Sequence, residues 1–524
     1  MCGGGIHGAW AALDAAQRGL KVALIDRGDF AGATSGNHQR IIHGGFRYLQ
    51  HADFRRLRES VRERSTLLRI APELVRPLPV LVPTLRVLTQ RRAALRAAMF
   101  TSDLMSIDRN RGLPPAQRIP RGTLLSRREA ALLTDGFNFG AGACTGAAMF
   151  YDAQVLSPER LVLSIVAAAA RDGAVVANYI EATDHLREGT RTSGVVARDV
   201  LSGHGLEIRA RLTVNCVGPW TGERVRALSS AGDRRFGLVK AAVLVVRNLG
   251  LRAALAVPCH GHSDRAELID RGYRNLFLSP WRGLTLVGTF YAPHHDGPDR
   301  CTVSERDVDT WIGALTTACP DLELSCDDVL NVYCGLLPRA PAGASSLELS
   351  KRSTIIDHAH EHGVEGVLSV SGVKFTTARS VAERAIDIAC RKLNRRTSTS
   401  RTARTRLRML GPALIENAYA GREVLEDPSA MRDAVARAVR EEMACTLADV
   451  VLARTDLAIA GMPPPHLLHT CARHMAELLG WDQRRTTREL RQLRERFPLC
   501  CAETGSTSDD QHTHPAHAGP VRTP

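Results

Sequence analysis

The sequence contains few lysines, few aromatic residues and no long apolar run. Only five of its 69 basic residues are lysines, aromatic residues make up 5%, and the longest strongly apolar stretch, residues 161–170, has ten residues. Because a membrane-spanning helix needs about 20 apolar residues, no transmembrane helix is expected. The 13 cysteines are odd in number and form no CxxC pair, and no secretory signal precedes them. We therefore expect reduced thiols, no disulfide framework and a cytoplasmic location.

The remaining composition is that of a globular protein with a basic charge. Hydrophobic residues make up 44% and charged residues 24% of the 524 residues, a length that suits about three domains of roughly 150 residues. The net charge of +14 is compatible with nucleic acid, a membrane surface or an anionic substrate. Since no helix-turn-helix, zinc finger or aromatic platform accompanies the charge, nucleic acid is not expected as a partner.

A glycine motif lies at the start of the chain. Residues 3–8 read GGGIHG, which fits GxGxxG, and a helix-forming stretch (9–18), Gly19, an apolar run (22–25) and an acid follow. Glycines let the backbone approach a pyrophosphate, the helix N-terminus offers free N–H groups, and the acid accepts from ribose hydroxyls. The motif predicts a dinucleotide-binding turn formed by Gly3, Gly5, Gly8 and Asp26. A glycine-rich terminal turn is the alternative.

The strand that should lead into this turn is short. Such a strand needs about five residues, and only Met1 and Cys2 precede the motif. The pattern therefore predicts that the central strand of the sheet is absent. Either the real start lies upstream of Met1, or the cofactor site is compromised.

Two further segments have the character of nucleotide-binding turns. Residues 34–49 read TSGNHQRIIHGGFRYL, and a strand-like run at 367–371 leads through Gly372 into a predicted helix at 376–389. A cofactor of the size of FAD needs contacts from separated segments, for its pyrophosphate, its ring system and its pyrimidine end. The three segments together predict FAD, whereas the last one alone would be an ordinary strand, turn and helix.

Several motifs resemble those of the FAD-dependent glycerol-3-phosphate dehydrogenases, oxidoreductases of the D-amino-acid-oxidase type. Residues 42–49 match the family's IHGGxRYL, and FYDA (150–153), VNCVGPW (214–220) and SGVKFTTAR (371–379) follow in the family's order. The similarity continues through an arginine-rich helix at 54–70 and extends over most of the chain up to about residue 500. It implies an α/β fold with a Rossmann-like FAD-binding domain, an antiparallel substrate domain and a helical C-terminal domain.

The resemblance also implies an activity. The family oxidises sn-glycerol 3-phosphate to dihydroxyacetone phosphate by hydride transfer to flavin and passes the electrons to quinone. We therefore expect a phosphorylated small-molecule substrate, a quinone or another electron acceptor, and peripheral contact with the inner face of the cell membrane. The resemblance leaves open whether the protein forms a homodimer. The residues that match the cofactor motifs are Thr34, Ser35, Gly44, Gly45, Gly218, Gly372, Lys374, Phe375 and Thr376.

Four residues within these motifs are candidates for the chemistry: His43, Arg47, Tyr48 and Lys374. Oxidation of an alcohol carbon needs a base for the hydroxyl proton, and a histidine suits that role near neutral pH. His43 precedes two glycines, which would let backbone and flavin approach each other. The other three would offer cationic and hydroxyl donors to a substrate phosphate. Without the resemblance, His43 would be read as a structural residue and Arg47 as a solvated charge.

Departures from the family pattern gather in the predicted substrate half. Residues 333–339 read YCGLLPR where the family has YAGVRPL, so Leu337 replaces an arginine. Residues 240–243 (KAAV) and 288–291 (GTFY) also differ, whereas Arg339 and the SKRS at 350–353 keep positive charge nearby. Two alternatives follow: an FAD-dependent enzyme for another small alcohol or amine, and a catalytically impaired flavoprotein-like binding module.

The predicted domains are discontinuous. Residues 1–225 form the first parts of the FAD-binding domain with an insertion at about 86–144, 226–344 the substrate domain, and 345–395 the final part of the FAD-binding domain. Apolar runs at 241–246, 276–278 and 284–287 are typical of strands in the substrate domain. Residues 396–502 form a helical domain, which Asp427-Pro428 and a four-residue spacing of apolar residues from Met431 to Val451 indicate. The polar tail at 503–524 is predicted to be disordered.

The remaining charged and histidine-rich segments are weaker candidates. Residues 259–262 (CHGH), 294–296 (HHD) and 358–362 (HAHEH) lack the two separated ligand pairs of a structural zinc site. We predict solvated loops there and expect no metal. The arginine-rich segments 55–58 and 85–100 fit either solvated helix faces or an anionic membrane surface.

Overall fold

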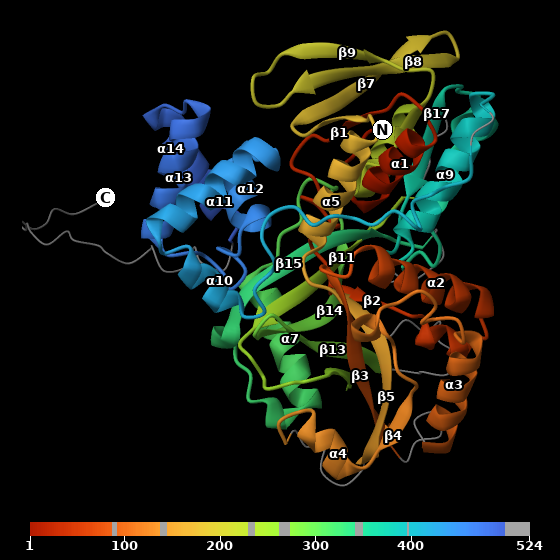
Figure 1. Cartoon of the computed structure of the whole chain (residues 1–524), viewed down its shortest axis with the longest axis vertical. Coiled ribbons are helices and arrows are strands. Elements are labelled where there is room, and N and C mark those ends of the chain that lie inside the picture. Colours follow the sequence, from red (N-terminus) through yellow and green to blue (C-terminus); the bar gives the residue numbers. More distant parts are fainter. Residues whose placement is uncertain are drawn as a thin grey trace, which may run out of the picture.

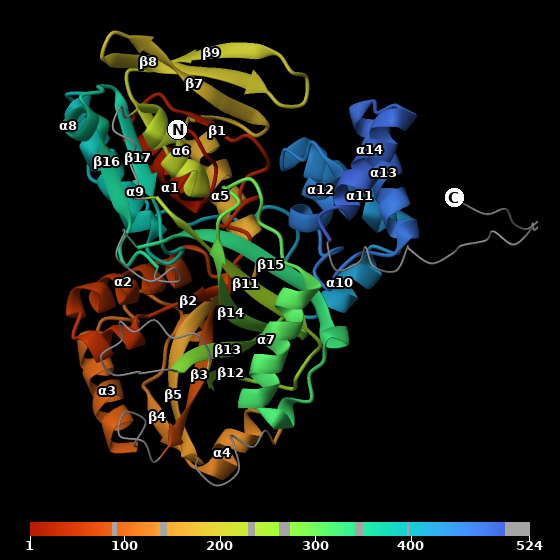
Figure 2. The ribbon, with the colours of Figure 1, turned by 180° about the vertical axis from the view of Figure 1, so that it is seen from behind.

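The computed structural model describes residues 1–85, 92–136, 144–228, 236–260, 273–340, 349–395 and 398–497. Three regions are visible in Figure 1 and, from behind, in Figure 2: a layered α/β region, a large sheet with flanking helices, and a group of helices near the C-terminus. The tail predicted to be disordered and the second half of the CHGH segment lie outside the described residues.

The α/β region is built on a short, mostly parallel sheet. In the first half β1 (Ala23–Ile25) pairs with β6 (Val175–Ala177) in parallel. In the second half β10 (Thr213–Asn215) pairs in parallel with β17 (Val367–Ser371), and β17 pairs antiparallel with β16 (Thr354–Asp357). The sheet is therefore assembled from segments that are far apart in the chain.

Cys2 joins the two halves of this sheet. It forms parallel bridges with both Ile25 and Asn215. Its N–H donates to the carbonyl of Val214 (3.0 Å), and the N–H of Gly3 donates to the carbonyl of Ile25 (2.8 Å). The prediction that the central strand is absent is therefore wrong, because residues 1–3 make the hydrogen bonds that such a strand would make with both neighbours.

Helices and a second, antiparallel sheet cover the two faces of the parallel sheet. On one face α1 (Ile6–Gln17), α5 (Pro158–Arg171) and α9 (Ala378–Lys392) share a core with β10 and β17. On the other face lie β7 (Ile180–Glu188), β8 (Arg191–Asp199) and β9 (Gly205–Arg209), whose Val195 and Ala197 pack on Cys2 and Ile25. The predicted Rossmann-like α/β architecture is confirmed.

Within the described residues, the large sheet has nine strands, in the order β15, β11, β14, β13, β12, β3, β5 and β2, with β4 beside β5. All its pairs are antiparallel except β12 with β3. The three apolar runs predicted as strands lie in β11, β13 and β14. The bounds are β15 (Val329–Pro338), β11 (Leu238–Val246), β14 (Leu284–His294), β13 (Tyr273–Trp281), β12 (Ala254–His260), β3 (Val75–Leu85), β5 (Cys144–Val155), β2 (Ile41–Ile42) and β4 (Thr123–Leu125).

Helices flank the large sheet: α2 (Phe54–Ile70), α3 (Arg92–Met105), α4 (Arg127–Leu132) and α7 (Glu305–Ala318). The predicted arginine-rich helix is confirmed as α2. It begins after Asp53, whose carboxylate accepts from the N–H of Arg56 (3.0 Å) and so satisfies a free donor at the helix start. In the part of the chain that the structure describes, no helix is long and apolar enough to cross a membrane.

The C-terminal region is helical: α10 (Ala418–Val424), α11 (Pro428–Glu441), α12 (Leu447–Asp449), the π-helical turn η7 (Val450–Arg454), α13 (Pro465–Leu479) and α14 (Gln483–Arg494). As predicted, α11 has proline at its first position, and the Asp427 carboxylate accepts from the N–H of Ser429 (2.7 Å). The four-residue spacing does not continue as one helix, because α11 ends at Glu441 and Met443 has a φ of 59°.

A buried salt bridge ties this helical region to the α/β region. The guanidinium of Arg454 has no exposed surface and donates to both carboxylate oxygens of Asp29, at 2.5 and 2.7 Å. The carbonyl oxygen of Glu442 accepts from the same guanidinium (2.9 Å). Asp29 lies in the loop after β1, so the contact holds that loop against the C-terminal helices. Removing one partner of such a pair costs about 3–5 kcal/mol, because the other charge stays buried.

Candidate active site

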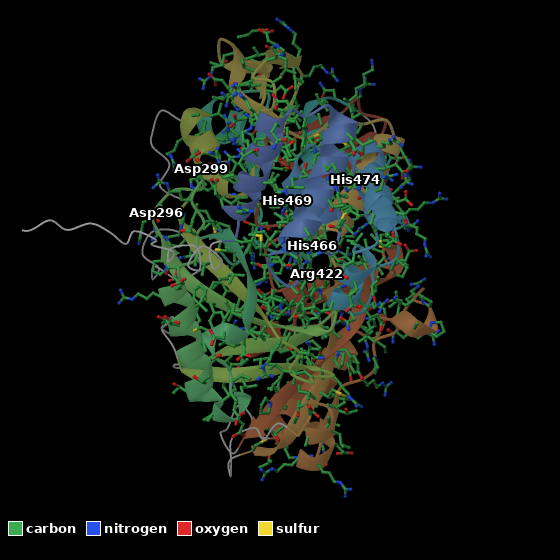
Figure 3. All side chains as sticks on the ribbon, turned by 90° about the vertical axis from the view of Figure 1, so that its left-hand side faces the viewer. Asp296, Asp299, Arg422, His466, His469 and His474 are labelled. Carbon is green, nitrogen blue, oxygen red and sulfur yellow. The ribbon has the colours of Figure 1, made fainter. Side chains whose placement is uncertain are left out.

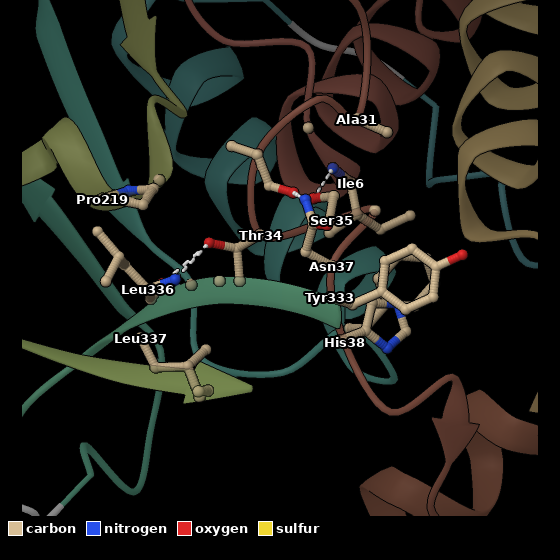
Figure 4. Close-up of a pocket in the computed structure, with 18 of the residues that line it drawn as sticks. Ile6, Ala31, Thr34, Ser35, Asn37, His38, Pro219, Tyr333, Leu336 and Leu337 are labelled. Atoms are coloured by element: carbon tan, nitrogen blue, oxygen red, sulfur yellow. Dashed lines mark hydrogen bonds between the residues drawn. The ribbon is translucent and has the colours of Figure 1, made fainter. Parts of the chain in front are cut away.

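A cavity of about 1700 Å³ brings the three predicted cofactor segments together. Its walls come from the turn before α1, residues 34–48, β15 and residues 370–376 (Figure 4). Every residue predicted for the site lines it except Gly8 and Gly44. Residues as far apart in the sequence as Gly3 and Thr376 therefore face one space.

The first glycine turn is held in shape by backbone contacts. Gly3 has a φ of +98°, and a Cβ there would lie 2.5 Å from the carbonyl oxygen of Cys216. A Cβ on Gly8 would lie 1.8 Å from the carbonyl oxygen of Gly3. Gly5 is the residue before α1, so the free N–H groups of that helix open towards the cavity. Gly8 therefore lets α1 pack closely against the turn, whereas Gly3 and Gly5 line the cavity.

Asp26 uses its carboxylate to hold this turn. One oxygen accepts from the N–H of Gly4 (2.6 Å) and the other from the N–H of Gly28 (2.9 Å). Burial raises the pKa of Asp26 to about 6, although both backbone hydrogen bonds act to lower it. The residue lines the cavity at the end of β1, where the motif predicts the ribose acceptor.

The hydroxyls of Thr34 and Ser35 fasten the second segment to its neighbours, as Figure 4 shows. The Thr34 hydroxyl donates to the carbonyl of Leu336 (2.9 Å) and accepts from the N–H of the same residue (3.2 Å). The Ser35 hydroxyl accepts from the N–H of Ile6 in the first turn of α1 (3.0 Å). These two residues therefore connect the glycine turn, the second segment and β15.

His43 forms a pair with Asp152 on β5. The two side chains meet at 3.0 Å between Nδ1 and a carboxylate oxygen. The second oxygen of Asp152 accepts from the N–H of Gly44 (2.6 Å) and from Arg64 (3.3 Å). Burial alone would raise the pKa of Asp152, but the hydrogen bond from His43 and the charge of Arg64 outweigh it and hold the pKa below its usual range. An ionised Asp152 fixes the proton of His43 on Nδ1, which leaves Nε2 as the acceptor.

The two glycines after His43 leave room for packing. A Cβ on Gly44 would lie 2.0 Å from a guanidinium nitrogen of Arg64, and one on Gly45 would lie 3.2 Å from the Cα of Leu57. Gly45 also has a φ of +86° and lines the cavity. Both glycines let α2 pack against this segment, and close approach to a flavin stays a prediction.

A group of cations surrounds Tyr48 at the cavity wall. The ammonium of Lys374 lies 4.3 Å from the centre of the tyrosine ring, and the guanidinium of Arg56 lies 4.9 Å from it. Burial, together with the like charge of Arg47, lowers the pKa of Lys374 to about 8. Asp53 holds Arg56 through a contact of 2.5 Å. The predicted donors Arg47, Tyr48 and Lys374 are thus brought together, with Arg56 as an addition.

The last predicted turn packs directly on the first. A Cβ on Gly372 would lie 2.1 Å from the ring of His7, and Phe375 lies against His38 with ring centres 4.6 Å apart. Gly218, with a φ of +55°, begins a short 3-10 helix that also borders the cavity. Thr376 is buried beside Phe375.

Within the described residues, four polar atoms of the cavity-lining residues have no hydrogen-bond partner: Nε2 of His7, Nε2 of His38, Oε1 of Gln39 and Nε of Arg40. Burial lowers the pKa of His7 to about 4 and that of His38 to about 3, so both rings are neutral near pH 7. Because Nδ1 of His38 accepts from the N–H of Arg40 (2.9 Å), its proton sits on Nε2. Buried polar atoms without partners are costly, and a cofactor with carbonyl and imide groups would satisfy them. The residues present therefore fit a flavin.

Arg40 anchors the second segment to the large sheet. Its guanidinium lies between the rings of Trp281 and Tyr333, 4.4 Å from each ring centre, and it pairs with both oxygens of Glu159 at 3.2 Å. Sequence reasoning missed this residue, His7, His38, Gln39 and Asp152. All five lie inside motifs that were recognised, but their partners are distant in the sequence.

Leu337 lines the cavity on β15, in the position where the family pattern has an arginine. Arg339 is not among the lining residues; its guanidinium packs against Gly237, where a Cβ would lie 2.6 Å from Nε. Lys351 lines the cavity instead. Arg352 lies 3.9 Å from Asp53 at the edge of the cation group. Arg339 is therefore badly placed to replace the missing arginine.

The histidine-rich segments do not form a metal site in the described part of the chain. No group of three or more histidine, cysteine, aspartate or glutamate side chains there could hold a metal ion. The prediction of solvated loops is wrong for residues 259–260 and His294, which lie in β12 and β14, and for 358–362, which form α8 (His358–His362). His358 is buried at the start of α8, with its Nε2 2.8 Å from the Ser369 hydroxyl.

A Rossmann-like region with a glycine turn, joined through one cavity to a large antiparallel sheet with a histidine–aspartate pair, defines a flavin-dependent oxidoreductase. The chain belongs to the family of FAD-dependent oxidoreductases, which matches residues 2–388, and its cofactor is FAD. Residues 411–486 match a second family, the C-terminal domain of alpha-glycerophosphate oxidase.

Known proteins similar to this chain agree with that assignment. The chain is 31% identical over 411 residues to a glycerol-3-phosphate dehydrogenase of Synechocystis, covering 75% of this chain and 70% of that protein. It is 29% identical over 428 residues to the mitochondrial glycerol-3-phosphate dehydrogenase of Homo sapiens, of which it spans 54%. The crystal structure of the glycerol-3-phosphate dehydrogenase from Bacillus halodurans complexed with FAD has the same fold, with a TM-score of 0.68 and 23% identity over 95% of both chains.

Proposed function

We propose that this protein oxidises sn-glycerol 3-phosphate to dihydroxyacetone phosphate. The observation that carries the proposal is the common position of two groups at one cavity: the His43–Asp152 pair, and the cations around Tyr48. The first suits the removal of a hydroxyl proton, and the second suits the binding of a phosphate. The resemblance to glycerol-3-phosphate dehydrogenases supports the same substrate.

In this proposal His43 is the base. Its Nε2 accepts the proton of the substrate's C2 hydroxyl, while Asp152 holds the other ring nitrogen in the protonated form and stabilises the imidazolium that results. When bound, FAD would supply the hydride acceptor for the C2 carbon. The alcohol would lose two electrons and two hydrogens in total, a hydride from C2 and the hydroxyl proton to His43, and become a ketone.

The phosphate is bound by the cation group. Lys374 and Arg47 supply charge, and Tyr48, whose ring lies 4.3 Å from the ammonium of Lys374, supplies a hydroxyl donor. Burial and the like charge of Arg47 oppose the charge on Lys374, so its pKa lies below that of a free lysine. A dianionic phosphate removes that penalty, so substrate binding and charge on Lys374 support each other.

The test is anaerobic reduction of the bound flavin, followed by loss of its visible absorbance. Glycerol 3-phosphate should bleach the flavin at micromolar to millimolar concentration, as is usual for enzyme substrates. Glycerol has the same carbon skeleton without the phosphate and should be at least about a hundredfold poorer as a substrate. Equal bleaching by both compounds would contradict the phosphate site, and no bleaching by either would contradict the activity.

Leu337 favours a second candidate function, oxidation of an uncharged small alcohol or an amine. An apolar side chain on the cavity wall replaces a charge that a phosphate would use. In that case glycerol or a small amine would reduce the flavin faster than glycerol 3-phosphate. A third candidate, an impaired flavoprotein that serves for binding, predicts a yellow protein that no member of a panel of alcohols, amines and sugar phosphates reduces.

We also propose that the electrons pass to a quinone at a membrane surface. A stripe of exposed apolar side chains supports membrane contact: Phe100 (71% exposed), Leu104 (61%) and Ile107 (80%). The first two are one helical turn apart on α3, and the third follows in the same direction. The exposed Arg96 and Arg111 flank the stripe, which suits an anionic lipid surface.

Co-sedimentation with vesicles of phosphatidylglycerol and phosphatidylcholine tests this contact. Phe100→Ser with Leu104→Ser should lower vesicle binding about tenfold, because it removes about half of the buried apolar surface. Val175→Ser is the matched control, since Val175 is equally exposed (71%) on β6. An equal loss of vesicle binding in the double variant and in the control would contradict binding through this stripe. Reduction of a soluble quinone analogue by the substrate-reduced protein tests the acceptor.

A further inference from the structure

Two cysteine sulfurs meet at the wall of the cavity. The Sγ atoms of Cys301 and Cys334 lie 2.9 Å apart. Cys334 is on β15, and Cys301 lies in the segment between β14 and α7. Both side chains are half-buried, and both line the cavity, so a small molecule that enters the cavity can reach them.

The surroundings of the two sulfurs favour one thiolate and one thiol. The hydrogen bond from Cys334 lowers the pKa of the Cys301 thiol, and the ammonium of Lys240 acts in the same direction. The pKa of Cys334 is raised, first by the hydrogen bond to Cys301 and then by burial. Lys240 is fixed next to them by the carbonyl of Thr302 (2.9 Å) and by Asp307 (3.1 Å). A thiol with a lowered pKa next to a second thiol and a fixed cation is the arrangement of a reactive pair.

Cys334 departs from the family pattern. Residues 333–335 read YCG where the pattern of the glycerol-3-phosphate dehydrogenases has YAG. An alanine there would occupy the same position on β15, opposite Ala242 on β11, without a sulfur.

We propose that Cys301 and Cys334 form a reversible disulfide when hydrogen peroxide enters the cavity. The Cys301 thiolate attacks peroxide, forms an S–O bond and releases hydroxide as the O–O bond breaks. The Cys334 sulfur then attacks the resulting sulfenic acid, which forms the S–S bond and expels water. Two thiols and one peroxide give one disulfide and two waters. The two sulfurs need to approach by about 0.9 Å to reach the bond length of a disulfide.

The disulfide would fasten a segment that spans both sides of the cavity. Asp299, two residues before Cys301, accepts from Arg27 (2.7 Å) and from the indole N–H of Trp220 (2.9 Å). Arg27 follows Asp26, and Trp220 follows the turn at Gly218, so one end of the segment contacts the cofactor side. Figure 3 shows Asp296 and Asp299 on the outer side of the molecule at this place. Oxidation would connect the other end covalently to β15 and so restrict exchange of the cofactor.

The test treats the FAD-loaded protein with hydrogen peroxide and maps the peptides without reduction. A peptide pair that links Cys301 to Cys334 is expected, and dithiothreitol should abolish it. Release of FAD into buffer, followed by its fluorescence, should slow about threefold or more after oxidation, because the segment must open locally for exchange. Cys301→Ser and Cys334→Ser should each abolish both effects.

Cys326→Ser is the matched control. Cys326 is exposed and its thiol donates to Asp309 (2.8 Å), and it is not among the lining residues of the cavity. This variant should form the 301–334 link and show the slower release as the wild type does. Absence of the link in oxidised wild-type protein would overturn the proposal. Unchanged FAD release despite the link would overturn the role in cofactor exchange.

Discussion

The two sides of the cavity are built by different means. On the cofactor side, the polar groups of Asp26, Thr34 and Ser35 are engaged by the protein itself, and glycines leave room for backbone contacts. On the substrate side, Lys374 meets an aromatic face and the like charge of Arg47, and Leu337 is apolar. The cofactor side depends on backbone geometry, which tolerates little change, whereas the substrate side depends on single side chains, which can be exchanged without loss of the fold.

Gly8→Val should break the cofactor side with the largest effect. Its Cβ would lie 1.8 Å from a backbone oxygen, which cannot move without disturbing the turn. We expect a loss of more than about 4 kcal/mol in the free energy of unfolding and almost no bound FAD. Flavin absorbance per protein and thermal unfolding measure both effects.

Gly313→Ala is the control for a glycine change. Gly313 lies within α7, and a Cβ there would meet no atom within 4 Å. FAD binding should be unchanged, and the helix should gain up to about 1 kcal/mol of stability. A loss of FAD from this variant would mean that the contrast between the two glycines is not steric.

His43→Asn should leave the cofactor in place and remove the base. We expect kcat to fall about 10²- to 10⁴-fold with unchanged flavin content. Asp152→Asn should also lower kcat strongly, because the amide can donate to Nδ1 of His43 and move the ring proton to Nε2, which then no longer accepts. His466→Asn, on the exposed surface of α13, is the control (Figure 3). Normal flavin reduction in His43→Asn would contradict its role as the base.

Lys374 gives the substrate side a pH dependence. Its pKa of about 8 lies below that of a free lysine, so its charge is lost as the pH rises through 8, and kcat/KM for glycerol 3-phosphate should then fall. Lys374→Arg keeps the charge at all these pH values and should remove this fall. Lys374→Met should lower kcat/KM at pH 7 by a factor that corresponds to about 2 kcal/mol of transition-state stabilisation, with FAD still bound. An identical pH profile in wild type and Lys374→Arg would contradict the assignment.

The smallest effects are expected at Leu337 and Arg339. If glycerol 3-phosphate is the substrate, the existing cations already bind its phosphate. Leu337→Arg should then change KM by a factor that corresponds to less than about 1 kcal/mol of binding free energy. Arg339→Ala should have no effect on KM, because Arg339 does not line the cavity, although Gly237, on which it packs, does. A strong loss of activity in Arg339→Ala would show that this arginine reaches the substrate after all.

The sequence predicts the cofactor side better than the substrate side for a physical reason. The glycine spacing at residues 3–8, the helix at 54–70 and the proline at the start of α11 are local signals, and the structure confirms the elements that they predict. The central strand was wrongly expected to be absent because Cys2 is paired from both sides by residues 23 to 213 positions away. Backbone pairing of that kind leaves no trace in a local pattern.

Partners of the catalytic candidates are hard to predict for the same reason. His43 was found from its motif, but its pairing with Asp152 depends on the register of β2 against β5. The unpartnered nitrogen of His38 and the exclusion of Arg339 from the cavity likewise become visible only when packing is known. Residue type and spacing predict which groups are available, whereas tertiary packing decides which of them face each other.

The salt bridge between Asp29 and Arg454 sets an order of events during synthesis. Its two residues are 425 positions apart, so at about 5–20 residues per second the ribosome needs about 20–85 s between them. During that time the loop after the glycine turn has no counter-ion, and the helices that bury it do not yet exist. The cofactor turn is therefore among the first segments to be made and among the last to reach its final surroundings, and a nascent chain that ends before Arg454 should hold FAD weakly.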